Sequence, residues 1–147
     1  MPTPDLLSAL VAYLRATASV TALVPAEKIT TEIAQPGTDP PYLLLTDYAE
    51  RLPGETAEDS QAELTVVVVT NDGLDHARTV GVVVKAAIDN PNGNPSSLAR
   101  SALSWTGGVE TSCFRNDSHP RRLAGIGRGG RYFYVEEIDY VFWVAPA

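Results

Sequence analysis

The sequence holds few of the features that covalent cross-links, membrane spans and export signals require. Its 147 residues include one cysteine, Cys113, so no disulfide can form within the chain, and this fits a reducing compartment. No run of about 18 apolar residues occurs, which excludes a membrane-spanning helix. The N-terminus lacks a basic start followed by an apolar core, so we expect no signal peptide.

Histidine is also scarce, with two residues, His76 and His119. Neither stands at metal-ligand spacing from a second histidine or from Cys113, so we expect no metal site. Cys113 is more typical of a small packed side chain than of a nucleophile. Residues 125–130 (GIGRGG) show the G-x-G-x-x-G spacing of dinucleotide-binding loops, but a strand is predicted after them, where such a loop needs a helix. The sequence therefore predicts no cofactor and no catalytic constellation.

Positive charge is in deficit, and the charges are unevenly distributed. The net charge of −7 argues against broad nucleic-acid binding. Residues 39–63 hold seven acidic residues and one basic residue, whereas residues 115–131 hold five of the eleven basic residues and one acidic residue. One acidic and one basic surface suit a subunit that meets copies of itself or oppositely charged partners. Two solvated loops that happen to differ in charge are the simpler alternative.

We call residues 47–63 the acidic segment and residues 115–131 the basic segment. Both are predicted to contribute to an interface with another subunit or with a partner protein. The candidate interface residues are Glu50, Arg51, Glu55, Glu58, Asp59, Arg115, Arg121, Arg122, Arg128 and Arg131.

The stretch from Gln61 to Asn90 predicts a strand followed by a helix. Apolar and polar residues first alternate in Gln61–Thr70, and four consecutive valines then indicate an inner strand that is buried on both faces. Asn71-Asp72-Gly73 breaks the strand and offers a helix N-cap. Spacings of three and four then relate Leu74, Ala77, Val80, Gly81, Val84 and Ile88. Gly81 costs about 1 kcal/mol of helix propensity, so we expect it where the helix backbone closely approaches the sheet.

Further elements flank this stretch. Thr3-Pro4-Asp5 is typical of a helix start with Thr3 as the cap, and this helix is predicted to end near Thr17. Short helical turns are predicted at Val20–Val24 and Ser96–Ser104. The remaining predicted strands are Ile29–Ile33, Tyr42–Tyr48, Val109–Arg115 and Tyr132–Val144, the last with a bulge at Glu136-Glu137.

The predicted order of the main elements is α, β, β, β, α, β, β, without an internal repeat or a domain linker. This order predicts an α+β fold in a single domain, residues 1–147, with one mostly antiparallel sheet of four to five strands and two main helices packed on a face. The content of 44% hydrophobic and 20% charged residues is typical of a globular chain. Residues 49–60 would join two strands as a long acidic hairpin connection.

Several features follow one another in a characteristic order. An amphipathic helix at Leu6–Leu14 precedes a turn of small residues at 18–24, and Pro41-Tyr42 then leads into an apolar strand. The polar connection, the valine strand and the helix of Gln61–Asn90 come next, and the last strand ends close to the C-terminus. This order spans nearly the whole chain and resembles that of the tail terminator (tail-completion) proteins of long-tailed bacteriophages.

The resemblance implies a structural virion protein and not an enzyme. In that role six copies would form a homohexameric ring on the last ring of the tail tube, end tube polymerisation and present their other face to the head completion or connector protein. DNA would pass through the lumen without sequence-specific binding, and no membrane would be involved. The resemblance implies a place in the neck region of the virion tail, after assembly in the host cytoplasm.

A ring that closes on itself needs two unlike complementary surfaces on each subunit. The acidic and basic segments could supply these two surfaces. The acidic segment could instead line the lumen, where negative charge would keep passing DNA from sticking. The sequence leaves both placements open.

Three other functions remain as alternatives. The first is a head-side connector or stopper protein of the same neck. The second is a small-ligand-binding α+β regulatory module with a pocket lined by Trp105, Trp143 and Tyr134. The third is a hydrolase that would use Cys113 together with His119 or His76.

Overall fold

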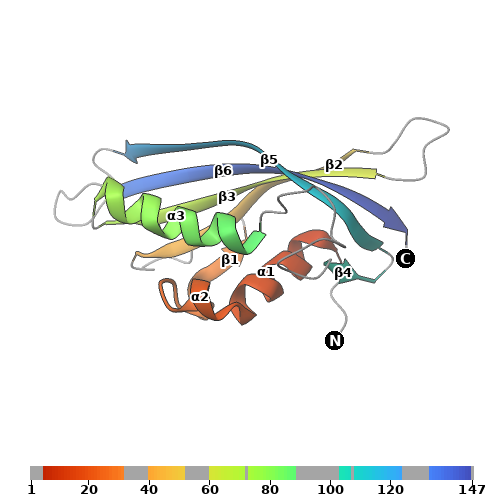
Figure 1. Cartoon of the computed structure of the whole chain (residues 1–147), viewed down its shortest axis with the longest axis horizontal. Coiled ribbons are helices and arrows are strands. Elements are labelled where there is room, and N and C mark those ends of the chain that lie inside the picture. Colours follow the sequence, from red (N-terminus) through yellow and green to blue (C-terminus); the bar gives the residue numbers. More distant parts are fainter. Residues whose placement is uncertain are drawn as a thin grey trace.

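The structure is a computed structural model, and it describes residues 5–31, 40–51, 60–71, 73–88, 103–106, 108–123 and 133–146. Within these ranges, three α-helices pack against one sheet (Figure 1). The helices are α1 (Leu6–Ala16), α2 (Ala18–Thr21) and α3 (Leu74–Ile88), with a 3-10 turn, η1, at Ala26–Lys28. The strands are β1 (Ile29–Thr31), β2 (Tyr42–Arg51), β3 (Ser60–Thr70), β4 (Ser104–Trp105), β5 (Gly108–Leu123) and β6 (Phe133–Pro146).

The sheet has six strands in the order β1-β2-β3-β6-β5-β4. β1 runs parallel to β2, and the other neighbouring strands are antiparallel. The predicted α+β class is therefore confirmed, but the predicted mostly antiparallel sheet of four to five strands is wrong in its number of strands, and the parallel pairing of β1 makes the sheet a mixed one. The two-residue β4 is too short to produce an alternating pattern, and the direction in which a strand pairs leaves no trace in its own sequence.

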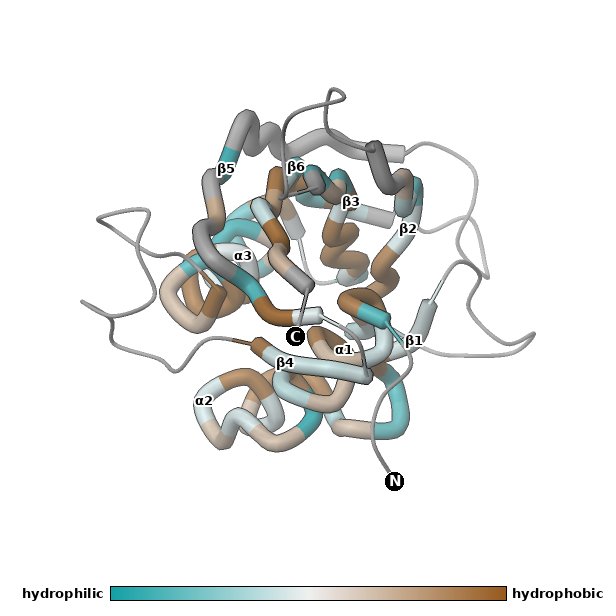
Figure 2. The backbone as a smooth tube through the Cα atoms, turned by 90° about the vertical axis from the view of Figure 1, so that its right-hand side faces the viewer, coloured by the Kyte–Doolittle hydropathy of each residue, from teal (hydrophilic) through white to brown (hydrophobic). Residues whose placement is uncertain are grey.

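β3 lies at the centre of the sheet, between β2 and β6, as the run of valines predicts. Val66 and Val68 are fully buried on the face that the helices cover, and Val69 is 4% exposed on the other face. Figure 2 shows the sheet curved over the helices, with β5, β6, β3 and β2 forming the arc. The described helices lie on one side of the sheet, as predicted (Figure 1).

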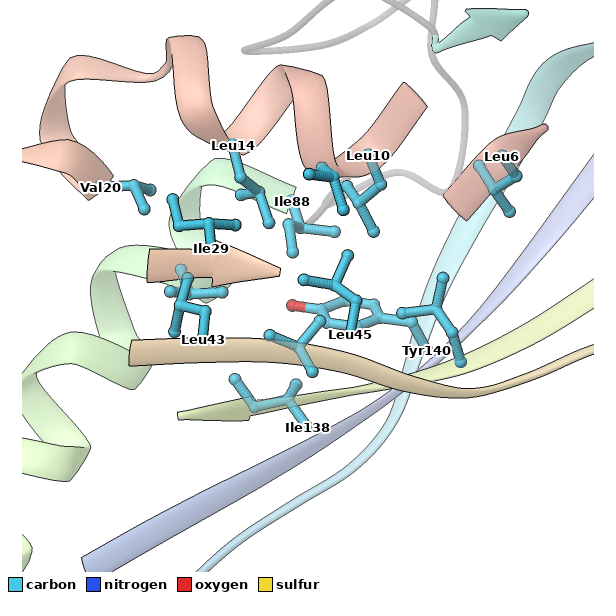
Figure 3. Packing of buried hydrophobic residues seen from close by; sticks show 14 of the residues in the cluster. Leu6, Leu10, Leu14, Val20, Ile29, Leu43, Leu45, Ile88, Ile138 and Tyr140 are labelled. Carbon is cyan, nitrogen blue, oxygen red and sulfur yellow. The ribbon is translucent and has the colours of Figure 1, made fainter. Parts of the chain in front are cut away.

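The hydrophobic core fills the space between this concave face and the helices (Figure 3). Fully burying one large aliphatic side chain stabilises a fold by about 1.5–3 kcal/mol, so a cluster of this size fixes the helices on the sheet. Its largest members are Leu6, Leu10, Leu14 and Ile88 from the helices and Ile29, Leu43, Leu45, Leu64, Ile138, Tyr140 and Phe142 from the strands.

α1 begins two residues later than the predicted cap would require. The Asp5 side chain accepts a hydrogen bond from the Ser8 N–H at 2.8 Å, and Asp5 has extended backbone angles, so Asp5 is the N-cap. The prediction of Thr3 as the cap is wrong, and Thr3 itself lies outside the described residues. Aspartate is the stronger N-cap of the two, because its carboxylate accepts the free N–H and favours the positive end of the helix dipole.

β6 is regular where a bulge was predicted. It pairs with β3 without a shift from Tyr134 to Val144, so the predicted bulge at Glu136-Glu137 is wrong. The register shifts lie in β5 instead, one between Glu110 and Ser112 and one between Arg115 and Asp117. Glu136 keeps its place in the alternation because Lys85 of α3 neutralises its carboxylate inside the core.

Other boundaries also differ from the prediction. β5 extends to Leu123, beyond the predicted end at Arg115, and the short helical turn after α1 covers Ala18–Thr21. Of the predicted turn at Ser96–Ser104, residues 96–102 lie outside the described residues, and Ser104 begins β4. None of the helices in the described ranges has the length and apolar content needed to cross a membrane.

Candidate assembly interface

Part of the basic segment lies on β5, an outer strand of the sheet. β5 pairs with β6 along its length and, among the described residues, with β4 at its first two positions alone. Arg115, Arg121 and Arg122 lie on this strand, and the Arg115 side chain is exposed. Arg128 and Arg131 fall outside the described residues. β5 thus carries three of the five predicted arginines.

Part of the acidic segment lies at the end of β2. Glu50 and Arg51 are the last two residues of this strand and pair with the beginning of β3. Glu55, Glu58 and Asp59 belong to the connection between β2 and β3 and fall outside the described residues. The predicted hairpin between these two strands is confirmed by their antiparallel pairing.

The pairing register places the end of β2 far from Arg121 and Arg122 within one subunit, whereas Arg115 lies closer, opposite Tyr140 of β6. Glu50 aligns with Ala62, which aligns with Phe142 of β6, whereas Arg121 aligns with Val135 of β6. Phe142 and Val135 are seven residues apart on one strand, which corresponds to about 23 Å. β2 ends at the right of the sheet in Figure 1 and β5 ends at the left. The fold therefore separates the acidic end of β2 from the arginine-bearing end of β5.

The face of the sheet opposite the helices has a depression of about 220 Å³. It is lined by Asp47, Glu63, Thr65 and Asp139, among others. The hydroxyl of Thr65 donates a hydrogen bond to Asp139 Oδ1 at 2.7 Å, which fixes this carboxylate. Asp47 lies where the register of β2 shifts and has a positive φ of 56°. Three carboxylate side chains therefore border one concave surface.

Asp47 and Glu63 belong to the acidic segment, whereas Asp139 lies far from it in the sequence, in the last predicted strand. Asp139 joins them because β6 pairs with β3, so that Thr65 lies directly opposite it. Glu137 and Asp139 share this face, since they alternate with the buried Glu136 and Ile138. That two-residue spacing is the signal that could have revealed an acidic sheet face.

Cys113 and His119, which were considered for catalysis, do not lie together. Cys113 is buried and lies opposite Phe142, whereas His119 lies opposite Glu137. These positions on β6 are five residues apart, about 16 Å, so the sheet holds Cys113 and His119 apart. His76 lies on α3 and is partly buried. Across the part of the chain that the structure describes, no three His, Cys, Asp or Glu side chains are placed to hold a metal ion.

The aromatic residues considered for a ligand pocket are also separated. Tyr134 and Trp143 are nine residues apart on β6, about 30 Å, and they lie on opposite faces of the strand because the spacing is odd. Trp105 packs against the core from β4. Residues 125–130, with the glycine spacing of a dinucleotide loop, lie outside the described residues, and strand β6 follows them.

Glu110 is a titratable residue outside the depression that serves the fold. Glu110 is 2% exposed; its Oε1 accepts from the backbone N–H of Leu103 at 3.0 Å, and its own N–H donates to the Leu103 carbonyl at 2.8 Å. This pair of bonds closes the turn that leads into β5.

Burial raises the pKa of the Tyr42 hydroxyl above its usual value of 10.0, because the charged form loses hydration.

Comparison with known families and structures identifies this fold. Residues 8–112 match a protein family that is described as "tail completion protein gp17". The chain belongs to this family. The tail completion protein is thus a structural protein of the phage tail and lies in the tail of the virion. A comparison with curated proteins found no match.

A solved structure shares the fold of this tail completion protein. It is a chain of the "virion of native gene transfer agent (GTA) particle", to which the present chain is similar with a TM-score of 0.65 and 19% sequence identity. The similarity covers 96% of this chain and 93% of that chain. The shared fold therefore extends beyond residue 112, over the strands β5 and β6.

Proposed function

We propose that the tail completion protein closes a ring of six identical subunits on the last ring of the tail tube, ends tube polymerisation and joins the tail to the head connector. The observation that carries this proposal is the separation of unlike charges across one sheet. Glu50 and Arg51 end β2, and the acidic residues Glu55, Glu58 and Asp59 follow them in the sequence, whereas Arg121 and Arg122 lie just before the end of β5, on a different edge and at the opposite end of the sheet. Membership of the tail completion family supports the place of assembly.

A ring forms by a heterologous contact, in which one surface of a subunit meets a different surface of the next. If acidic and basic groups lay together in one subunit, they would neutralise each other and leave little for a neighbour. The separation of Glu50 from Arg121, about 23 Å along the strands, lets the β2 end of one subunit face the β5 end of the next. Complementary charge of this kind steers association and fixes the orientation of the subunits.

The second acidic surface suits a different role in the same ring. Asp47, Glu63 and Asp139 lie on the face of the sheet opposite the helices, about the depression described above. On the inside of a ring, these carboxylates would repel DNA phosphates and let the genome pass without binding. We propose that this face borders the lumen, which leaves the acidic end of β2 for the neighbouring subunit.

Capping of purified tail tubes tests this function. Tail tube protein is polymerised with and without the tail completion protein, and tube lengths and tube ends are recorded by electron microscopy. We expect shorter tubes with a ring of added density at one end. Unchanged tube lengths and bare ends would overturn the proposal, and binding to the head connector with no binding to tubes would favour the head-side stopper.

Charge variants test the role of the basic segment. Arg115→Glu, and separately the combined replacement of Arg121, Arg122 and Arg128 by Glu, should leave the fold intact and weaken capping, with a loss that shrinks as salt screens the charges. Arg78→Glu is the matched control for Arg115→Glu, because Arg78 is likewise exposed but lies on α3. Capping equal to wild type by both basic-segment variants at physiological salt would remove this segment from the interface.

A further inference from the structure

An ion pair between the partly exposed Lys85 and the buried Glu136 joins α3 to β6 in a largely apolar layer. Lys85 Nζ lies 2.6 Å from Glu136 Oε1, and the two side chains are 20% and 3% exposed. The carboxylate of Glu136 rests against the backbone of α3 at Gly81. A Cβ atom at position 81 would overlap Glu136 Oε2 and would stand 2.6 Å from Glu136 Cδ. Gly81 and Lys85, one helical turn apart, thus enclose a carboxylate that comes from the sheet.

Stability alone does not account for this arrangement. Glycine lowers the helix propensity of α3, and taking two charges out of water costs more than apolar side chains of similar size would. Both destabilising contributions arise at the same place on α3, although the neighbouring buried residues, Val80 and Val84, are apolar. Apolar surfaces pack in several alternative ways with little loss of stability, whereas a salt bridge over a glycine fits one arrangement alone.

The ion pair lies next to the arginines that we assign to the subunit interface. Glu136 pairs with Val68 of β3 on one side and with Pro120 of β5 on the other. Arg121 and Arg122 follow Pro120 directly along β5. The position of α3 against Glu136 therefore affects the position of β5, the strand that carries these arginines.

We propose that Gly81, Lys85 and Glu136, which we call the α3 clamp, hold α3 on β6 in one register and thereby position the arginine-bearing end of β5 for contact with a second copy of this chain. The clamp residues are positioning residues, because they reach the interface through β5 and not by contact. This inference rests on the proposed ring function, and it adds which buried residues prepare the interface.

The test replaces the ion pair by unbranched apolar side chains of similar length, in the double variant Lys85→Met/Glu136→Met. We expect unfolding by urea to show equal or greater stability than wild type. We expect amide hydrogen exchange in residues 117–123 and in α3 to become faster by about tenfold, and the concentration needed for half-maximal tube capping to rise by about tenfold, while β2 and β3 keep their protection. Lys85→Arg, which preserves the ion pair, should retain both wild-type values.

Two outcomes would overturn the inference. A double variant that caps tubes like wild type, with unchanged amide exchange in 117–123, would show that the clamp does not position this strand. A double variant that unfolds would make the pair a stabilising element instead. If the wild-type protein itself fails to cap tubes, the ring function fails, and the exchange experiment still reports whether the clamp orders β5.

Discussion

The hydroxyl of Tyr13 in α1 donates a hydrogen bond to the backbone carbonyl of Ala87 in α3, at 2.6 Å. Ala87 belongs to the last turn of α3, where carbonyl oxygens find no partner within the helix. The bond therefore satisfies a helix end and ties together two helices that are far apart in the sequence. It acts on the same helix as the α3 clamp, two residues beyond Lys85.

The first prediction concerns this bond. Tyr13→Phe keeps the ring and removes the donor, so the free energy of unfolding should fall by about 1 kcal/mol. Urea unfolding measures the change. Val82→Thr, at a side chain 61% exposed on the outer side of α3, is the control and should stay within about 0.5 kcal/mol of wild type. Equal stability of Tyr13→Phe and wild type would show that the bond contributes nothing.

The second prediction decides between two caps of α1. Because Asp5 accepts the N–H of Ser8, Asp5→Ala should lower the free energy of unfolding by about 1 kcal/mol. Thr3→Ala, at the residue that the sequence pattern favours, should have no measurable effect. Thermal unfolding of both variants gives the comparison. A larger loss from Thr3→Ala than from Asp5→Ala would restore the cap predicted from sequence.

The sequence predicted the elements whose own side-chain pattern repeats. α3 buries Ala77, Val80, Gly81, Val84 and Ile88, which are five of the six positions on the predicted stripe. The helix period alone placed them, because one face of a helix shows itself over a few turns. The close approach at Gly81 was also predicted, since a glycine inside a helix needs a reason.

The relations between elements could not be predicted in the same way. The depression beside Asp47 exists because Thr65 and Asp139, 74 residues apart, are neighbours in the sheet. Alternation within one strand shows which residues share a face, but it does not show which strand lies alongside. The parallel pairing of β1 and the bulges of β5 are also relations between strands, and the pattern within one strand does not show them. The partner of Glu136 was missed because a carboxylate in a strand is most often solvated.

The third prediction follows from the environment of Tyr42. Its folded-state pKa is raised by burial above the value of 10.0, so its contribution to stability is fully present below pH 10 and is lost as the pH rises through the folded-state pKa. The free energy of unfolding of wild type should therefore fall more steeply above pH 10 than that of Tyr42→Phe. Urea unfolding between pH 8 and 11 measures both slopes. Parallel slopes would show that Tyr42 ionises equally in the folded and unfolded states.

The last prediction concerns Gly81→Ala. Alanine should stabilise a helix interior by about 1 kcal/mol, but the new methyl group would displace the Glu136 carboxylate from Lys85, so we expect a net loss of about 1–3 kcal/mol. In a Glu136→Ala background the overlap is gone, and the same change should stabilise. Ala86→Gly, at an exposed position of α3, calibrates the propensity term in this helix. Gly81→Ala could instead stabilise wild type by as much as Ala86→Gly destabilises it. The Glu136 carboxylate would then move aside without cost, and its close packing on α3 would not explain the glycine at position 81.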